Sequence, residues 1–153
     1  MLTIKEKQEL NVQKALSFRG IIEESELESI KRDMDSVIIN NNISARGEFI
    51  TVTYGIEGEK LDMELIIPID SDVDVTAEGY RIRDDVRIEN AVVASYQGSP
   101  DTFTDVFMEL NRYITDNNLE PATAGYNVFR GSVYNEIEGC MDICVDVYLG
   151  VAN

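Results

Sequence analysis

The 153-residue sequence contains no histidine and no tryptophan. The absence of histidine excludes histidine-activated nucleophiles, histidine proton shuttles and most zinc sites. The two cysteines, Cys140 and Cys144, are too few for a disulfide framework, and four residues apart on a strand they would lie roughly 13 Å apart. We therefore expect two reduced thiols.

Long apolar runs are also missing. No stretch approaches the ~20 apolar residues of a membrane span, and the N-terminal "MLTIKEKQEL" lacks the basic and then apolar pattern of a signal peptide. We expect a cytoplasmic protein that does not contact a membrane.

Basic residues are scarce, since 13 lysines and arginines stand against 29 acidic residues and give a formal charge of −16. Proteins that bind nucleic acid bring basic patches to phosphate, so direct nucleic-acid binding is not expected. The acidity fits a soluble surface, and it also fits a protein that attracts cations or basic partners.

Signatures of phosphate and metal binding are absent as well. The segment "GIEGEK" (55–60) lacks the spacing of a phosphate loop and is better interpreted as a hairpin turn. The segment "DSDVDV" (70–75) does not continue into the glycine and distal glutamate of a calcium loop. We predict no metal site and no cofactor.

What the sequence does contain is a weak internal repeat. "MELIIPI" (63–69) resembles "MDICVDV" (141–147), and "SFRG" (17–20) resembles "SYQG" (95–98), both at an offset of 78. In the intervening helical stretch the offset is 76, and apolar residues fall on apolar residues. These pairs are Leu27 with Phe103, Ile30 with Val106, Met34 with Leu110, Val37 with Tyr113 and Ile38 with Ile114.

Each half of the chain predicts the order β-α-β-β. Extended segments at about 2–18 and 80–96 end near a glycine, and a helix follows. Ser25 with Glu28 indicates a capping box for the first helix, and Ser99 before Pro100 indicates a cap for the second. The asparagines at 41–42 and 117–118 suit helix ends. Hairpins are predicted from 49–54 with 61–69 and from 126–129 with 141–149.

The sequence therefore predicts an α+β fold of two pseudo-symmetric β-α-β-β modules, with antiparallel sheets and helices on one side. Each module has roughly 75 residues and would be marginally stable alone. We expect one domain over residues 1–153, with repeat 1 at about 1–75 and repeat 2 at about 76–153.

Strand alternation places acids together on one side of each final strand. Asp142, Cys144, Asp146 and Tyr148 share a face, while the aliphatic residues between them share the other and should pack beneath the helix. By the same parity, Glu64 lies opposite Met63 and Leu65. The carboxylates should face a cleft or solvent.

The repeated unit resembles the effector-binding domain of multidrug-responsive bacterial transcription regulators, the gyrase-inhibitor-like small-molecule-binding family. The residues that carry the resemblance are "VASYQGSPDTF" (93–103), "ELIIP" (64–68) and "DICVD" (142–146). The chain departs from the family pattern in "FRGIIEESELE" (18–28), which lacks a proline-led helix start, and at Asp146, where proline is usual. The resemblance implies a cleft at the module junction, lined by strand residues, that binds hydrophobic and often cationic compounds.

Three classes of function follow from these observations. The first is a stand-alone small-molecule-binding protein without a DNA-binding domain. The second is an acidic interaction module that engages a basic protein, such as a secretion companion, an immunity factor or an enzyme inhibitor. The third, implied by the resemblance, is a small-molecule hydrolase using a glutamate and a tyrosine. An enzyme is less expected than a binding protein, and no catalytic residue is assigned.

The predicted ligand-binding residues are Glu64, Asp142, Asp146, Tyr54, Tyr96 and Tyr126. Like charge and partial burial should raise the pKa of Glu64 or Asp142.

Overall fold

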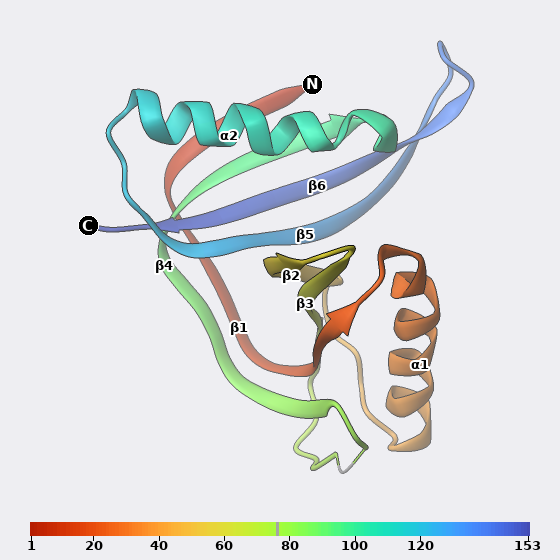
Figure 1. The fold of residues 1–153 in the computed structure, drawn as a ribbon. Coiled ribbons are helices and arrows are strands. Elements are labelled where there is room, and N and C mark those ends of the chain that lie inside the picture. The colour runs from red at the N-terminus through yellow and green to blue at the C-terminus, as the bar shows by residue number, and fades with distance from the viewer. Residues whose placement is uncertain (76) are drawn as a thin grey trace. The chain divides into compact units, whose positions relative to one another are not determined.

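The computed structural model describes residues 1–75 and 77–153 and shows an α+β fold (Figure 1). The described elements, in chain order, are β1 (Leu2–Ile22), a 3₁₀ turn (Glu24–Glu26), α1 (Leu27–Asn40), β2 (Ile50–Glu57), β3 (Lys60–Pro68), β4 (Tyr80–Gly98), a 3₁₀ turn (Pro100–Thr102), α2 (Thr104–Asp116), β5 (Pro121–Asn135) and β6 (Cys140–Val151). The order β-α-β-β thus occurs twice, while the duplication and its pseudo-twofold symmetry stay predictions.

The chain divides into two compact units. We name the α1 unit, residues 11–87, and the α2 unit, residues 1–10 with 88–153. Both long strands are shared, because the start of β1 belongs to the α2 unit and the start of β4 belongs to the α1 unit. Each unit is described below by itself.

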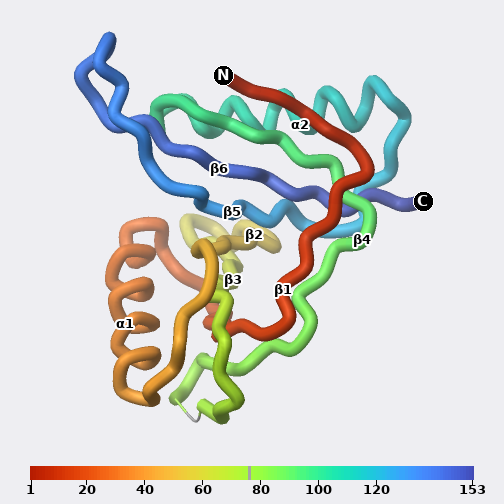
Figure 2. Tube along the Cα trace, turned by 180° about the vertical axis from the view of Figure 1, so that it is seen from behind, coloured from red at the N-terminus to blue at the C-terminus, as the bar shows by residue number. Residues whose placement is uncertain are grey.

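In the α1 unit, β3 pairs with β1 on one side and with β2 on the other, both antiparallel. Helix α1 packs on one face of these strands (Figure 2). Its buried residues Met34 and Ile38 join Met63, Leu65 and Ile67 in one apolar core. This confirms the parity predicted for β3. Leu27 and Ile30 are only partly buried against that core.

The predicted start of α1 is wrong. Ser25 lies inside the 3₁₀ turn, and Glu23 fills the capping position, where its N–H donates a 2.8 Å hydrogen bond to the Glu26 carboxylate. Gly20 does not begin a turn either, because β1 continues through it to Ile22. Two β-branched isoleucines at 21 and 22 favour extended backbone and prolong the strand.

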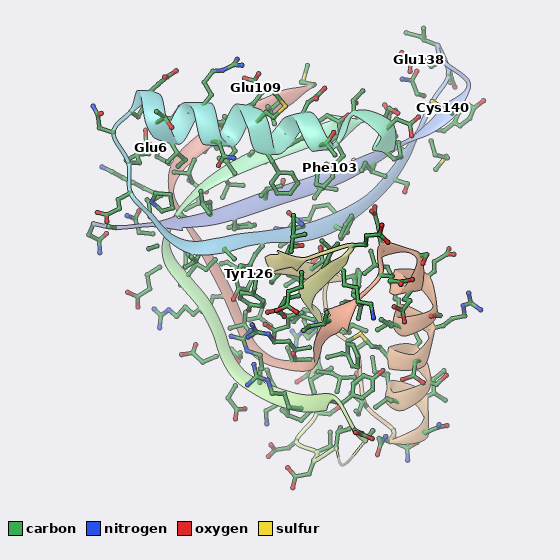
Figure 3. The ribbon with its side chains drawn as sticks, in the orientation of Figure 1. Glu6, Phe103, Glu109, Tyr126, Glu138 and Cys140 are labelled. Carbon is green, nitrogen blue, oxygen red and sulfur yellow. The ribbon has the colours of Figure 1, made fainter. Side chains whose placement is uncertain are left out.

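In the α2 unit, β6 pairs antiparallel with β4 and with β5, and α2 covers one face of these strands (Figure 1). Val145, Val147 and Leu149 pack with Val106, Leu110 and Ile114 of the helix, as predicted. Ser99 caps the 3₁₀ turn that leads into α2, since its Oγ accepts a 3.2 Å hydrogen bond from Asp101 N. Phe103 is partly buried beneath α2 (Figure 3).

Both helices end as their asparagine runs predict. Asn42 and Asn118 adopt left-handed backbone, with φ of 53° and 54°. Asn41 and Asn117 cap the helices through their side chains, which donate to carbonyls four residues back. Lys7 and Asp85, which are 78 residues apart, also have positive φ, 57° and 63°. Within the described residues, neither helix is long and apolar enough to cross a bilayer.

Strand pairing does not follow the sequence offset in the final strands. Arg19 faces Glu64, whereas Gln97, 78 residues after Arg19, faces Cys144. The pairing partners are therefore 80 residues apart, and Asp142 does not take the register position of Glu64. The longer β5–β6 hairpin accounts for the difference, because its strands extend to Asn135 and Cys140 (Figure 2).

Candidate functional site

The candidate site surrounds Glu64, which lies in the middle of β3. Alternation along the strand turns Met63 and Leu65 into the core beneath α1 and turns Glu64 to the opposite face. The glutamate side chain is wholly buried, with 0% of its surface exposed. A buried carboxylate is costly unless it is paired and hydrogen-bonded, so its partners decide its state.

Four side chains surround the Glu64 carboxylate. Ser17 Oγ on β1 donates to Oε2 at 2.5 Å, and Tyr54 Oη on β2 donates to Oε1 at 2.6 Å. Arg83 Nη1 on β4 lies 3.0 Å from both oxygens. Arg81 Nη2 lies 3.6 Å from Oε2. We call these five residues the Glu64 cluster. All of them belong to the α1 unit.

The cluster keeps Glu64 ionised. Burial alone would raise the pKa of its carboxyl, but hydrogen bonds from Ser17 and Tyr54, with the charge and hydrogen bonding of Arg83, outweigh burial and lower the pKa below its usual range. A raised pKa was expected for at least one of Glu64 and Asp142, and for Glu64 the shift has the opposite direction. The sequence suggested like charges nearby, whereas the structure places arginines there.

A β-bulge positions Tyr54. The β2–β3 register shifts between Thr53 and Gly55, so Tyr54 is the extra residue. The guanidinium of Arg19 lies 4.0 Å from the centre of the Tyr54 ring and donates to both oxygens of Asp62 at 3.3 and 3.1 Å. The ring of Tyr54 thus stacks with a cation while its hydroxyl bonds to Glu64.

A hollow of about 570 Å³ adjoins the cluster through Arg81. Its lining also includes Lys14, Tyr80, Asp72, Asp74 and Asp84. Lys14 Nζ bonds to Asp72 at 2.5 Å and lies 3.9 Å from Asp84. The hollow therefore mixes acids with bases, and the described residues hold no cluster of three or more acids, cysteines or histidines fit to bind a metal.

The six residues predicted from sequence do not form one group. Glu64 and Tyr54 are in direct contact in the α1 unit, and the other four belong to the α2 unit. Asp142 is buried near the β5–β6 turn, where Asn135 Nδ2 donates to it at 3.3 Å. Tyr96 packs on the α2 side and bonds through its hydroxyl to Ser99 O at 2.8 Å.

Asp146 and Tyr126 share the face of the α2 unit that the helix does not cover. Arg130 Nε donates to Asp146 at 2.9 Å, and Arg130 Nη2 donates to Tyr148 Oη at 3.0 Å. Tyr126 is buried and pairs with Tyr148 across the strands. Asp146 also lines a hollow of about 250 Å³ with Tyr96, another of the predicted residues, and with Ser95 and Cys144. The thiols of Cys140 and Cys144 are unbridged, as predicted.

Sequence reasoning missed Ser17, Arg81 and Arg83. The arginines lie in "RIRDD" (81–85), a segment for which the sequence predicts no site. Alternation was the available signal, since Arg81 and Arg83 share one parity while Tyr80 and Ile82 pack in the α1 core. Which side chains of β4 lie against Glu64 depends on how the strands are arranged, and alternation within β4 alone does not show this.

Comparisons with known proteins identify solved structures that share this fold. The sequence matches no protein-family model and no curated protein. The structure resembles the EcmrR C-terminal domain with a TM-score of 0.77 at 15% identity, covering 100% of this chain and 98% of that domain. In the EcmrR–DNA complex the TM-score is 0.78 at 17% identity, and the chain spans 57% of the EcmrR chain.

Two further solved structures match over almost their whole length. A hydrolase from Listeria innocua has a TM-score of 0.58 at 11% identity, covering 99% of this chain and 91% of that one. SAV2435 bound to tetraphenylphosphonium has a TM-score of 0.56 at 7% identity, covering 100% and 94%. These neighbours are consistent with the family resemblance. At such identities the likeness establishes the fold alone, and that fold is the one of the EcmrR C-terminal domain.

Proposed function

We propose that this protein binds small hydrophobic cations and that Glu64 supplies the negative charge that recognises them. The observation that carries the proposal is an ionised and wholly buried carboxylate on a strand face that α1 does not cover. Burying a charge costs several kcal/mol even after pairing, and a well-packed apolar residue is often at least as stable. Such groups are concentrated at functional sites.

The chemistry of the cluster favours a cation. Ser17 and Tyr54 donate to the carboxylate and hold it in place. Both are neutral donors, so the charge of the carboxylate is matched by a positive group, at present Arg83 at 3.0 Å. Tyr54, 38% exposed, also offers an aromatic ring that already stacks with a guanidinium. A carboxylate beside an aromatic ring suits organic cations through charge pairing and cation–π contact.

The comparisons add support of a limited kind. SAV2435, which shares the fold, was solved bound to tetraphenylphosphonium, a hydrophobic cation. EcmrR was solved on DNA, and the chain spans 57% of EcmrR. The absence of direct nucleic-acid contact by this chain, like its cytoplasmic location, stays a prediction.

The hydrolase alternative has one observation in its favour, the 2.6 Å contact between Tyr54 and Glu64. The lowered pKa of Glu64 weakens it, because a general base works best with a pKa near the working pH. The alternative of an acidic module that engages a basic protein rests on the net charge of −16 and does not point to particular residues.

Titration calorimetry with tetraphenylphosphonium tests the proposal. Wild type should bind this probe, and Glu64→Gln should weaken binding about 10-fold or more, the scale of a lost charge-assisted contact. Tetraphenylborate, which has the same shape and the opposite charge, should not bind at this site. Glu59→Gln, an exposed acid in the β2–β3 turn, is the matched control for net charge. Equal losses in Glu59→Gln and Glu64→Gln would reject Glu64 as the recognition site.

A further inference from the structure

The partners of Glu64 differ in how easily they can leave it. Glu64 is wholly buried, whereas the side chain of Arg83 is 22% exposed and that of Arg81 is 60% exposed. Long arginine side chains reach solvent by rotating about several bonds. The arginines can therefore move off the carboxylate, which itself is fixed by β3.

The hydrogen-bonding capacity of the carboxylate is fully used. An ionised carboxylate offers about four acceptor positions. Here Oε2 accepts from Ser17 and Arg83, and Oε1 accepts from Tyr54 and Arg83. A new donor must displace an existing one. A tetraalkyl or tetraaryl cation donates no hydrogen bond. It therefore only has to take the place beside the carboxylate that an arginine's positive charge now occupies.

Resting on the function proposed above, we infer that Arg83 is an internal counter-ion that occupies the place of the ligand's charge and must leave for a cation to bind. Nη1 of Arg83 lies 3.0 Å from both carboxylate oxygens, so this one nitrogen brings positive charge to the whole carboxylate. The hydroxyls of Ser17 and Tyr54 keep the carboxylate ionised and aimed during the exchange.

Acidic side chains lie next to Arg83 in sequence and in the hollow that Arg81 lines. Asp84 follows Arg83 directly, and Asp72 and Asp74 line the same hollow as Asp84 and Arg81. Relocation toward these carboxylates would offset part of the cost of breaking the Arg83–Glu64 pair.

The inference predicts that removing Arg83 tightens cation binding. If Arg83 occupies the carboxylate about 90% of the time, its removal should raise the affinity for tetraphenylphosphonium roughly 10-fold, since apparent affinity scales with the fraction of competent protein. Arg83→Gln is the test variant, measured at pH 8 so that Glu64 is ionised. Arg32→Gln, an exposed arginine on α1, is the control for net charge.

The outcomes separate the two proposals. Tighter binding by Arg83→Gln, lost again in Arg83→Gln/Glu64→Gln and absent for tetraphenylborate, supports the counter-ion. Unchanged or weaker binding by Arg83→Gln, with Glu64→Gln still defective, overturns the counter-ion and leaves the proposed function intact. Binding by neither wild type nor Arg83→Gln overturns both.

A second measurement on wild type covers the case in which Arg83→Gln fails to fold. Phenylglyoxal modifies accessible arginines, and mass spectrometry locates the product. Saturating tetraphenylphosphonium should increase modification of Arg83 several-fold and leave Arg32 unchanged. Protection of Arg83 by the probe, or no change at Arg83 under saturation, would overturn the exchange.

Discussion

Tyr54 Oη donates a 2.6 Å hydrogen bond to Glu64 Oε1 from the residue at which β2 loses register with β3. A bulge re-aims one side chain without moving the rest of its strand. Here it brings a phenol hydroxyl to a buried carboxylate, and the ring stays available to the Arg19 guanidinium.

Removing that hydroxyl should weaken ligand binding and leave the α2 unit unaffected. Tyr54→Phe deletes one donor to an ionised acceptor, which typically costs about 1.5–3 kcal/mol when both groups are buried and less when, as here, the phenol is partly exposed. We expect a measurable loss of tetraphenylphosphonium affinity by calorimetry. Tyr96→Phe is the matched control, because its hydroxyl bonds to Ser99 and Thr102 beside α2. A greater loss for Tyr96→Phe would contradict this placement.

The stability of the protein should fall in acid partly through Glu64. Because the folded-state pKa of Glu64 is lowered, its ionised form contributes stability that is fully present above the unfolded value near 4.5 and is lost as the pH falls through the lower folded value. Urea unfolding from pH 7 to pH 3 should show this loss. Glu64→Gln should flatten that part of the profile, and an identical pH profile in wild type and variant would refute the assignment.

Side chains on the packed face of α2 should contribute more to the free energy of unfolding than side chains on its exposed face. Leu110 is 2% exposed in the apolar core, so Leu110→Ala should cost about 2–5 kcal/mol in the free energy of unfolding. Met108, 63% exposed on the same helix, provides the comparison, and Met108→Ala should change stability by less than about 0.5 kcal/mol. Urea melts of both variants check the difference. Similar costs would show that the helix face is wrongly assigned.

The division into units predicts how fragments behave. Residues 1–75 lack Arg83, Tyr80 and Ile82, which belong to the α1 unit, and leave Glu64 without its main counter-ion. Residues 76–153 lack Leu2 and Ile4, which pack in the α2 core. Both fragments should fold poorly, as chains of this size are marginal even when complete. Residues 11–87 should show more cooperative urea unfolding by circular dichroism than residues 1–75, and the reverse order would contradict the unit boundaries.

Left-handed backbone at Lys7 predicts a stabilising substitution. A non-glycine residue at φ of 57° carries a steric cost of roughly 1–2 kcal/mol, and glycine relieves it. After the entropy cost of glycine in the unfolded chain, Lys7→Gly should stabilise by up to about 1 kcal/mol. Lys5→Gly, on the same strand with ordinary φ, should destabilise. Thermal melts compare the two, and a loss of stability in Lys7→Gly would contradict the backbone assignment.

Local patterns in the sequence predicted much of the fold. The apolar spacing of residues 103–114 identified the face of α2, the alternation in 141–149 identified the face that α2 covers, and the asparagine pairs marked both helix ends. These features depend on neighbours a few residues apart. The start of α1 was missed because Ser25 and Glu28 offer a better cap in sequence than Glu23, which the chain uses.

The candidate site could be predicted only in part. Glu64 and Tyr54 were identified from their own strands and do meet, but Ser17 and Arg83 reach Glu64 from strands 47 and 19 residues away. Register between distant strands depends on bulges and hairpin lengths, which the residue pattern does not encode locally. The same limit explains why Asp142 was paired with Glu64. When the pairing register shifts by two residues, each side chain stays on the same face of its strand. The alternation of apolar and polar residues therefore does not reveal the shift.

The boundary of the α1 unit has a consequence for the order of synthesis. Ser17, Tyr54, Glu64, Arg81 and Arg83 all lie between residues 11 and 87, one uninterrupted stretch of chain. The α2 unit, in contrast, needs the first ten residues together with the last part of the chain. As the protein leaves the ribosome, the carboxylate and its whole set of donors are therefore present before β5 and β6 have been translated. The first ten residues must wait for their partners until β4, β5 and β6 have been translated.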